Sequence, residues 1–162
     1  MQVNVTYEKI DDCTKTIKRM VEIIQKHYND LQDFKGLSLR DFFFYVCGLE
    51  YRKDPQGMEQ IARPKFTLLK DWPCRDCDDK TILMGSFCKL KKIPFSIYTC
   101  SYKENKRMGH VFGRAKVQNE RIEGKVRYTG LIWLDATYPD CQFNELRRPE
   151  KITALKQQTD FF

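Results

Sequence analysis

Three residues of the types that cooperate in covalent catalysis follow one another along the chain, namely Cys77, His110 and Asp135. They lie in the segments WPCRDCDDK, GHV and WLDAT. In such a set the thiol is the nucleophile, the imidazole is its base, and the carboxylate orients the imidazole. A thiol attacks as thiolate, and its ordinary pKa of about 8.5 falls at a helix N-terminus and beside an imidazolium. These residue types predict attack on a carboxamide or peptide carbonyl, with a thioester intermediate.

The neighbours of Cys77 act on its pKa in opposite directions. Helix amides and a charged His110 lower the thiol pKa, whereas the carboxylates of Asp78 and Asp79 raise it by repulsion. At about 100° per residue, both acids project away from the Cys77 side chain, and both favour the start of a helix. We therefore expect a reactive thiol. The oxyanion formed by its attack needs the Cys77 backbone amide and one further donor. Candidates for that donor are Tyr51, Gln60 and Trp72.

The motifs resemble those of the transglutaminase-like superfamily of cysteine enzymes. The resemblance rests on CDDK at the start of an apolar helix that ends in KIP, followed by GHV and WLDAT, and it covers roughly residues 54–139. The CDDK form, preceded by DPQGMEQIARP, is similar to members encoded by bacteriophages and prophages. The resemblance implies a papain-like α+β core. It also implies that Cys77 is the nucleophile, His110 the general base and acid, and Asp135 the residue that orients His110.

One position departs from the family pattern. Members often have Gly-Asp before the nucleophile, whereas this chain has Arg75-Asp76. Two interpretations of Arg75 are open: it steers an acidic substrate at the mouth of the site, or it points into solvent.

The thioester predicted for this chain has two fates. Transfer to water gives proteolysis or amide hydrolysis, and transfer to an amine gives crosslinking. A compact chain favours hydrolysis, so we expect a cysteine peptidase or amidase that needs no cofactor or metal. The alternative is a structural or assembly component of a phage particle, in which the triad is idle, because fold likeness does not establish activity.

The cysteines allow two other interpretations. Cys74 and Cys77, together with His110 and Cys141, are suitable ligand types for zinc, but a second closely spaced pair is missing. A redox role for the CxxC segment lacks a flanking thioredoxin-like βαβ unit. Cys74 is interpreted as a residue of the site wall. Small core positions are expected for Cys13, Cys47, Cys88 and Cys100.

The N-terminal third is predicted to be mainly helical. Apolar residues recur at helical spacing over 14–34, and Ser38 is placed to cap a second, strongly apolar helix that extends to Leu49. Val3, Val5 and Tyr7 alternate as in a short strand. Residues 54–72 are expected to form a long connection that walls one side of the site and contains a short helix around Gln60.

The remainder is predicted to deliver the histidine and the aspartate to one sheet edge. Strands are expected over 95–100, 111–117 and 128–134, with a charged turn at 101–108 and a polar connection at 118–125. Hairpin-connected strands are antiparallel, so His110 and Asp135 come close together. The predicted fold is α+β, with helices packed on an antiparallel sheet. A basic turn at 147–151 is expected to lead into a short terminal helix, and Phe161 and Phe162 to pack on the body.

Composition limits the class of protein. With 162 residues, 41% of them apolar, the chain suits one domain over 1–162. We divide it into N-terminal elements (1–53), a catalytic core (54–139) and a C-terminal tail (140–162). Lys and Arg are interleaved with acids, so the net charge of +7 indicates a solvated basic surface rather than nucleic-acid binding. The expected partners are a peptide or protein substrate and phage structural proteins.

The expected location follows from the apolar pattern and the cysteines. The sequence has no apolar run long enough to cross a membrane, and residues 1–8 lack the pattern of a signal peptide. Seven irregularly spaced cysteines do not form a disulfide framework, which favours reduced thiols. We expect synthesis in the cytoplasm of a bacterial host, with the virion as a further location.

Overall fold

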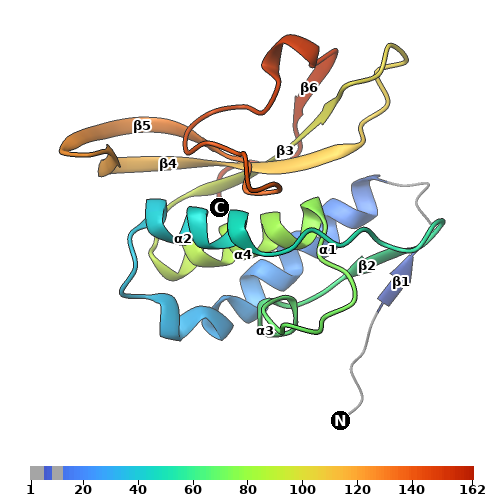
Figure 1. The fold of residues 1–162 in the computed structure, drawn as a ribbon, viewed down its shortest axis with the longest axis horizontal. Helices are drawn as coiled ribbons and strands as arrows, with labels where there is room; N and C mark the ends of the chain where they lie inside the picture. Colours follow the sequence, from blue (N-terminus) through green and yellow to red (C-terminus); the bar gives the residue numbers. More distant parts are fainter. Residues whose placement is uncertain (1–5, 9–12) are drawn as a thin grey trace.

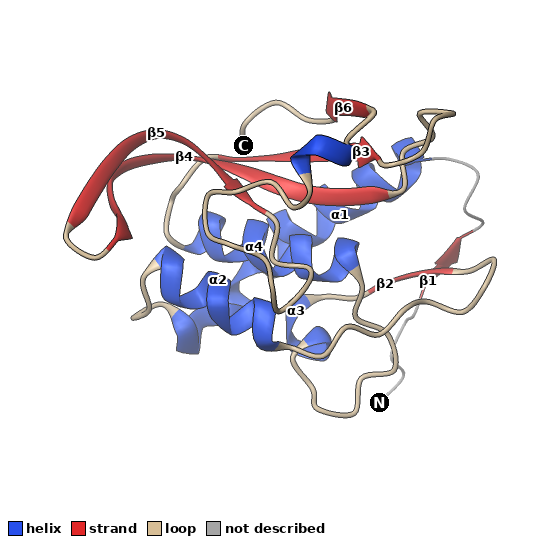
Figure 2. Cartoon of the chain, turned by 45° about the horizontal axis from the view of Figure 1, so that its top comes forward, coloured by secondary structure: helices blue, strands red, loops and turns tan. Residues whose placement is uncertain are grey.

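A curved antiparallel sheet lies against a layer of helices (Figures 1 and 2). The computed structural model describes residues 6–8 and 13–162. The sheet contains β3 (Phe95–Ser101), β4 (His110–Glu123), β5 (Val126–Leu134) and β6 (Ala154–Gln157), in the order β5-β4-β3-β6. Every pair of neighbouring strands in it is antiparallel. The α+β prediction is therefore confirmed.

The helical layer is built around α4 (Cys77–Leu90), which contacts every other helix as well as β3 and β4. The other helices are α1 (Cys13–His27), α2 (Leu39–Gly48) and the short α3 (Pro64–Thr67), and a 3-10 helix over Tyr28–Phe34 follows α1. From Asp78 to Leu90 every residue of α4 except Lys89 is buried. Because α4 is covered on all sides, its N-terminal residue is held rigidly against the sheet.

Local sequence signals explain the first two helices. The buried residues of α1 are Ile17, Met20, Ile23 and Ile24, which share one face as the helical spacing predicts. Ser38 accepts a hydrogen bond from the Asp41 backbone N–H at 3.0 Å, so the predicted N-cap of α2 is confirmed. The predicted helix over 14–34 is tightened into 3-10 geometry in its last part.

Close approach of helix and sheet depends on Phe95. A Cβ atom added at Gly113 would lie 2.2 Å from the Phe95 ring, and one added at Gly85 would lie 2.8 Å from it. Gly85 belongs to α4 and Gly113 to β4, so both layers omit a side chain where this ring inserts. The missing methyl groups allow α4 to pack directly under β4, the strand that begins with His110.

Two predicted elements differ from the structure. Gln60 lies in β2 (Glu59–Ile61), which pairs with β1 (Thr6–Glu8), and the short helix of this connection is α3 instead. Pairing with β1 gives the backbone of residues 59–61 the hydrogen bonds that the predicted helix would have provided. The polar segment 118–125 continues β4 as far as Glu123, with register irregularities on the way to β5, because backbone pairing needs no apolar face. The predicted strand residues Val3 and Val5 lie outside the described residues.

The C-terminal segment ends in a strand rather than the predicted helix. A 3-10 turn at Pro149–Lys151 leads to β6, which pairs with the free edge of β3. Phe162 exchanges backbone hydrogen bonds of 2.9 and 3.0 Å with Phe95, and the two rings meet edge to face. The prediction that the terminal aromatic residues pack on the body is therefore confirmed for Phe162.

Candidate active site

His110 and Asp135 form a hydrogen-bonded pair at one edge of the sheet. His110 opens β4, and Asp135 follows directly after the last residue of β5, whose Leu134 pairs with Gly113. His110 Nε2 lies 2.7 Å from Asp135 Oδ2, and only 9% of the histidine side chain and 1% of the aspartate side chain are exposed. A carboxylate in this place accepts a hydrogen bond from the Nε2–H group of His110. The other ring nitrogen, Nδ1, is thereby left as the proton acceptor.

The second oxygen of Asp135 is held by Thr137. Asp135 Oδ1 accepts hydrogen bonds from the Thr137 hydroxyl at 2.6 Å and from its backbone N–H at 3.3 Å. Burial opposes ionisation of Asp135, but the bonds from His110 and Thr137 outweigh it and hold the carboxyl pKa below its ordinary value. The aspartate therefore stays ionised and fixed in orientation.

A buried lysine supports this arrangement from the helical layer. Lys80, in the first turn of α4, is 1% exposed, and its Nζ donates to the carbonyl oxygens of Leu49 at 2.6 Å and Thr137 at 2.7 Å. The loop that carries Asp135 and Thr137 is thus bonded directly to the helix that carries Cys77.

Cys77 is the first residue of α4, as its sequence context predicts. Asp76 is the N-cap, and its side chain accepts a hydrogen bond from the Asp78 backbone N–H. The Thr81 hydroxyl lies 2.7 Å from the Cys77 carbonyl oxygen and 3.2 Å from that of Val111, the residue after His110. The first turn of α4 is thereby bound to the start of β4.

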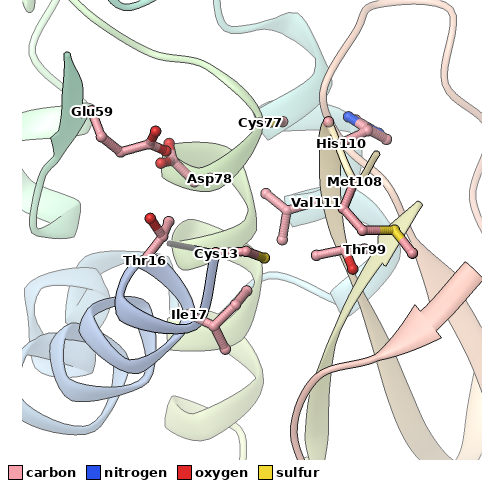
Figure 3. Close-up of a pocket in the computed structure, with 11 residues that line it drawn as sticks. Cys13, Thr16, Ile17, Glu59, Cys77, Asp78, Thr99, Met108, His110 and Val111 are labelled. Atoms are coloured by element: carbon pink, nitrogen blue, oxygen red, sulfur yellow. The ribbon is translucent and has the colours of Figure 1, made fainter. Parts of the chain in front are cut away.

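One pocket brings Cys77 and His110 together (Figure 3). It has a volume of about 170 Å³ and is lined from α1, β2, α4, β3 and the start of β4. Its lining residues are Cys13, Thr16, Ile17, Glu59, Cys77, Asp78, Thr99, Met108, Gly109, His110 and Val111. The nucleophile and base predicted from the sequence therefore share a cavity, and Glu59 is the part of the 54–72 connection that walls it.

The resting thiol of Cys77 is held in its neutral form. Burial raises its pKa well above the ordinary value, and the charges of Asp76, Asp135 and Glu59 act in the same direction. The Val111 backbone N–H opposes them. The expected balance was therefore wrong in its direction, because burial outweighs the helix amides. Asp78, expected to project away from the Cys77 side chain, lines the same pocket as Cys77.

This raised pKa predicts an unusual pH profile for Cys77 when its base is removed. In a His110→Ala variant, we expect the alkylation rate by iodoacetamide to rise about tenfold per pH unit between about pH 7 and pH 9, because only the thiolate reacts. Peptide mapping by mass spectrometry follows Cys77 specifically. A rate that levels off near neutral pH would contradict the neutral resting thiol.

The acids at the start of α4 serve as a framework. Among the described residues, Asp76, Asp78 and Asp79 are the group with the spacing to share a metal ion. Asp78 and Asp79 are buried, and burial first and then Asp76 raise their pKa values well above the ordinary value of an aspartate. Asp79 Oδ1 instead accepts from the Ala62 backbone N–H at 3.0 Å, which fastens β2 to α4.

The alternative zinc set is not assembled. No group formed by Cys74, Cys77, His110 and Cys141 occurs among the potential metal-binding clusters of the described chain. Cys74 is buried and its Sγ donates to Gln60 Oε1 at 2.9 Å, but it is not among the residues that line the pocket of Cys77 and His110, so its interpretation as a wall residue is not supported. Cys47, Cys88 and Cys100 are buried as predicted, whereas Cys13 is exposed because it opens α1 at the pocket rim.

Arg75 follows neither of its two interpretations. It is 3% exposed, and its guanidinium donates to three backbone carbonyl oxygens, those of Thr67, Glu50 and Leu69. It therefore joins the connection before α4 to the end of α2 and does not face a substrate. The planar guanidinium supplies several donors in one plane, which suits carbonyls that converge from different loops.

The three candidates for the second oxyanion donor differ in their surroundings. Cys77 is, after burial, the main influence that raises the Tyr51 pKa, and the Tyr51 ring stacks on Tyr138. Gln60 Oε1 accepts from Cys74, and Trp72 stacks on Phe66 while its buried ring N–H has no hydrogen-bond partner among the described residues. All three therefore stay candidates for this donor.

Sequence reasoning missed the supporting residues of the site. Lys80, Thr81 and Thr137 all lie within or beside the motifs. The bonds of Lys80 and Thr81 join segments far apart in the chain, whereas the Thr137 hydroxyl bonds to Asp135 two residues away. A lysine within an apolar helix face was the one available signal for Lys80.

In the part of the chain that the structure describes, no helix is long and apolar enough to cross a membrane. Comparisons of the chain with protein-family models, with curated proteins and with solved structures give no match.

Proposed function

We propose that this protein is a cysteine-dependent acyl-transfer enzyme of the transglutaminase-like type, acting as a peptidase or amidase. The observation that carries the proposal is the His110–Asp135 pair at 2.7 Å, whose histidine lines the same pocket as Cys77 at a helix N-terminus. The three groups come from a helix, a strand and a loop. Their convergence supports a nucleophile, a base and an orienting carboxylate in these roles.

The chemistry begins with proton transfer. Because the thiol is neutral at rest, His110 Nδ1 takes the Cys77 proton as sulfur attacks the substrate carbonyl carbon. The helix N-terminus faces the developing negative charge on oxygen. The backbone N–H groups of Asp78 and Asp79 already bond to side-chain oxygens of Asp76 and Asp78, whereas the hydrogen bonds described for this region do not use the N–H of Cys77. The Cys77 N–H is therefore the donor assigned to the oxyanion.

Collapse of the tetrahedral intermediate completes the first half of the reaction. The carbon–nitrogen bond breaks, the leaving amine takes the proton from His110, and a thioester to Cys77 remains. Water then attacks the thioester with His110 again as the base, which releases the carboxylic acid and restores the thiol.

The test is selective labelling by an electrophilic thiol probe near neutral pH, compared among wild type, Cys77→Ala and His110→Ala. We expect labelling to map to Cys77 in wild type and to fall by about 10²- to 10⁴-fold in His110→Ala. Labelled protein then justifies a search for hydrolysed peptides and carboxamides. Uniform slow labelling of several cysteines, unchanged by the His110 substitution, would refute the proposal and favour a structural phage component.

A further inference from the structure

The pocket beside Cys77 has a charge opposite to that of the whole chain. The protein carries a net charge of +7, yet the pocket lining contains two carboxyl groups, Glu59 and Asp78, and no Lys or Arg. Figure 3 shows these two side chains next to each other, across the pocket from His110. A substrate that enters here therefore meets an acidic end wall within a basic protein.

The two carboxyl groups do not contribute equally. Asp78 is 1% exposed, and its pKa is raised by burial first and then by Asp76, Asp79 and a hydrogen bond with Glu59. Asp78 is thus closed off from solvent, whereas Glu59 is partly exposed and is the carboxyl group that an incoming cation can reach. No ion pair among residues 6–8 and 13–162 neutralises Glu59.

The space between this charge and the nucleophile is largely apolar. Ile17 and Val111 are 6% and 7% exposed and line the pocket from α1 and β4, and Met108 extends the apolar wall. An unbranched hydrocarbon stem fits such walls, and a cation at its end meets Glu59. Long basic side chains combine these two properties, since the stem packs on apolar surface and the head carries charge.

We propose that this pocket is the subsite for a basic side chain of the substrate, with the stem between Ile17 and Val111 and the cationic head at Glu59. The inference rests on the proposed function, because it gives the substrate class of the same site. Binding of a cation also offsets the Glu59 charge, one of those that hold the Cys77 thiol neutral. A basic side chain therefore favours attack as well as binding.

Three chloroacetamide probes test the subsite, with tails of aminobutyl, pentyl and carboxypropyl. For each probe, the dependence of the Cys77 alkylation rate on probe concentration gives a binding constant and a maximal rate. The rate is then divided by the rate at which the same probe alkylates free cysteine. In wild type we expect the aminobutyl probe to exceed the pentyl probe by about five- to tenfold, and the carboxypropyl probe to be slowest. Glu59→Gln should bring the ratio of the aminobutyl rate to the pentyl rate close to one. Glu59→Lys should make the carboxypropyl probe faster than the aminobutyl probe.

Two further variants keep the test decisive. Glu150→Gln removes an exposed acid from the Pro149–Lys151 turn, outside the pocket, and should retain the wild-type preference. Thr16→Lys places a cation at the pocket wall without altering β2 and should abolish the preference for the aminobutyl probe. Cys77 labelling that depends on His110 but not on the tail would overturn the subsite alone. Absence of Cys77 labelling by all three probes would overturn the proposed function with it.

Discussion

Replacing Asp135 with asparagine is expected to slow alkylation of Cys77 near neutral pH by about 10³- to 10⁴-fold while leaving the fold intact. Thr137 donates two hydrogen bonds to Asp135 Oδ1, so it will hold the asparagine carbonyl oxygen in that position. The asparagine NH₂ group then points at His110 Nε2 and donates to it. The imidazole proton moves to Nδ1, which can no longer accept the proton of Cys77.

The measurement is the rate of Cys77 alkylation near neutral pH, together with the thermal unfolding midpoint. Asp140→Asn is the matched control, because Asp140 is an exposed aspartate whose carboxylate pairs with Arg147 outside the site. We expect that variant to label at the wild-type rate. An Asp135→Asn protein that labels within threefold of wild type would show that Asp135 does not set the histidine tautomer.

Replacing Lys80 with methionine is expected to lower the free energy of unfolding by about 2–4 kcal/mol, because two buried carbonyl oxygens lose their donor. The carbonyl of Thr137 is one of them, so the loop that carries Asp135 is loosened as well. Urea unfolding measures the loss, and Lys18→Met, on the exposed face of α1, should change stability by less than about 0.5 kcal/mol. Equal stability of Lys80→Met and wild type would remove Lys80 from this supporting role.

The effect of Lys80→Met on stability is expected to depend on pH. Burial lowers the Lys80 pKa from 10.5 to about 8, and a neutral amine still has the two donors that its two bonds require. Between about pH 8 and pH 10.5 the unfolded chain binds more protons than the folded one, so this group makes stability rise with pH. The stability difference between wild type and Lys80→Met should therefore be larger at pH 9.5 than at pH 7. A smaller difference at the higher pH would contradict the lowered pKa.

Local patterns predicted the elements that have strong periodicity or caps. The spacing of apolar residues located α1, the Ser38 cap located the start of α2, and the Cys77 motif located the start of α4. Motif order also identified the histidine and the aspartate that the sheet brings together. These features are encoded within a few residues of where they act.

Features that depend on distant partners were not predictable. β2 and β6 are short, and each exists because another strand accepts it, so neither has a decisive local pattern. Arg75 and Lys80 have polar side chains that would ordinarily face solvent, and only the convergence of carbonyl groups explains their burial. The direction of the Cys77 pKa also depends on burial, which the neighbouring residues do not reveal.

The docking of β6 on β3 has a consequence for how this protein folds. The segments 77–137, which contain every residue of the proposed triad, form mostly contacts between consecutive elements, whereas β6 joins β3 across more than 50 residues. Contacts between distant segments form late because the loop must close first. Until the C-terminal strand arrives, β3 presents an open edge of backbone donors and acceptors, which is a template for pairing with another chain. Refolding at high protein concentration should therefore lose material to self-association through this edge, even where residues 77–137 have already folded.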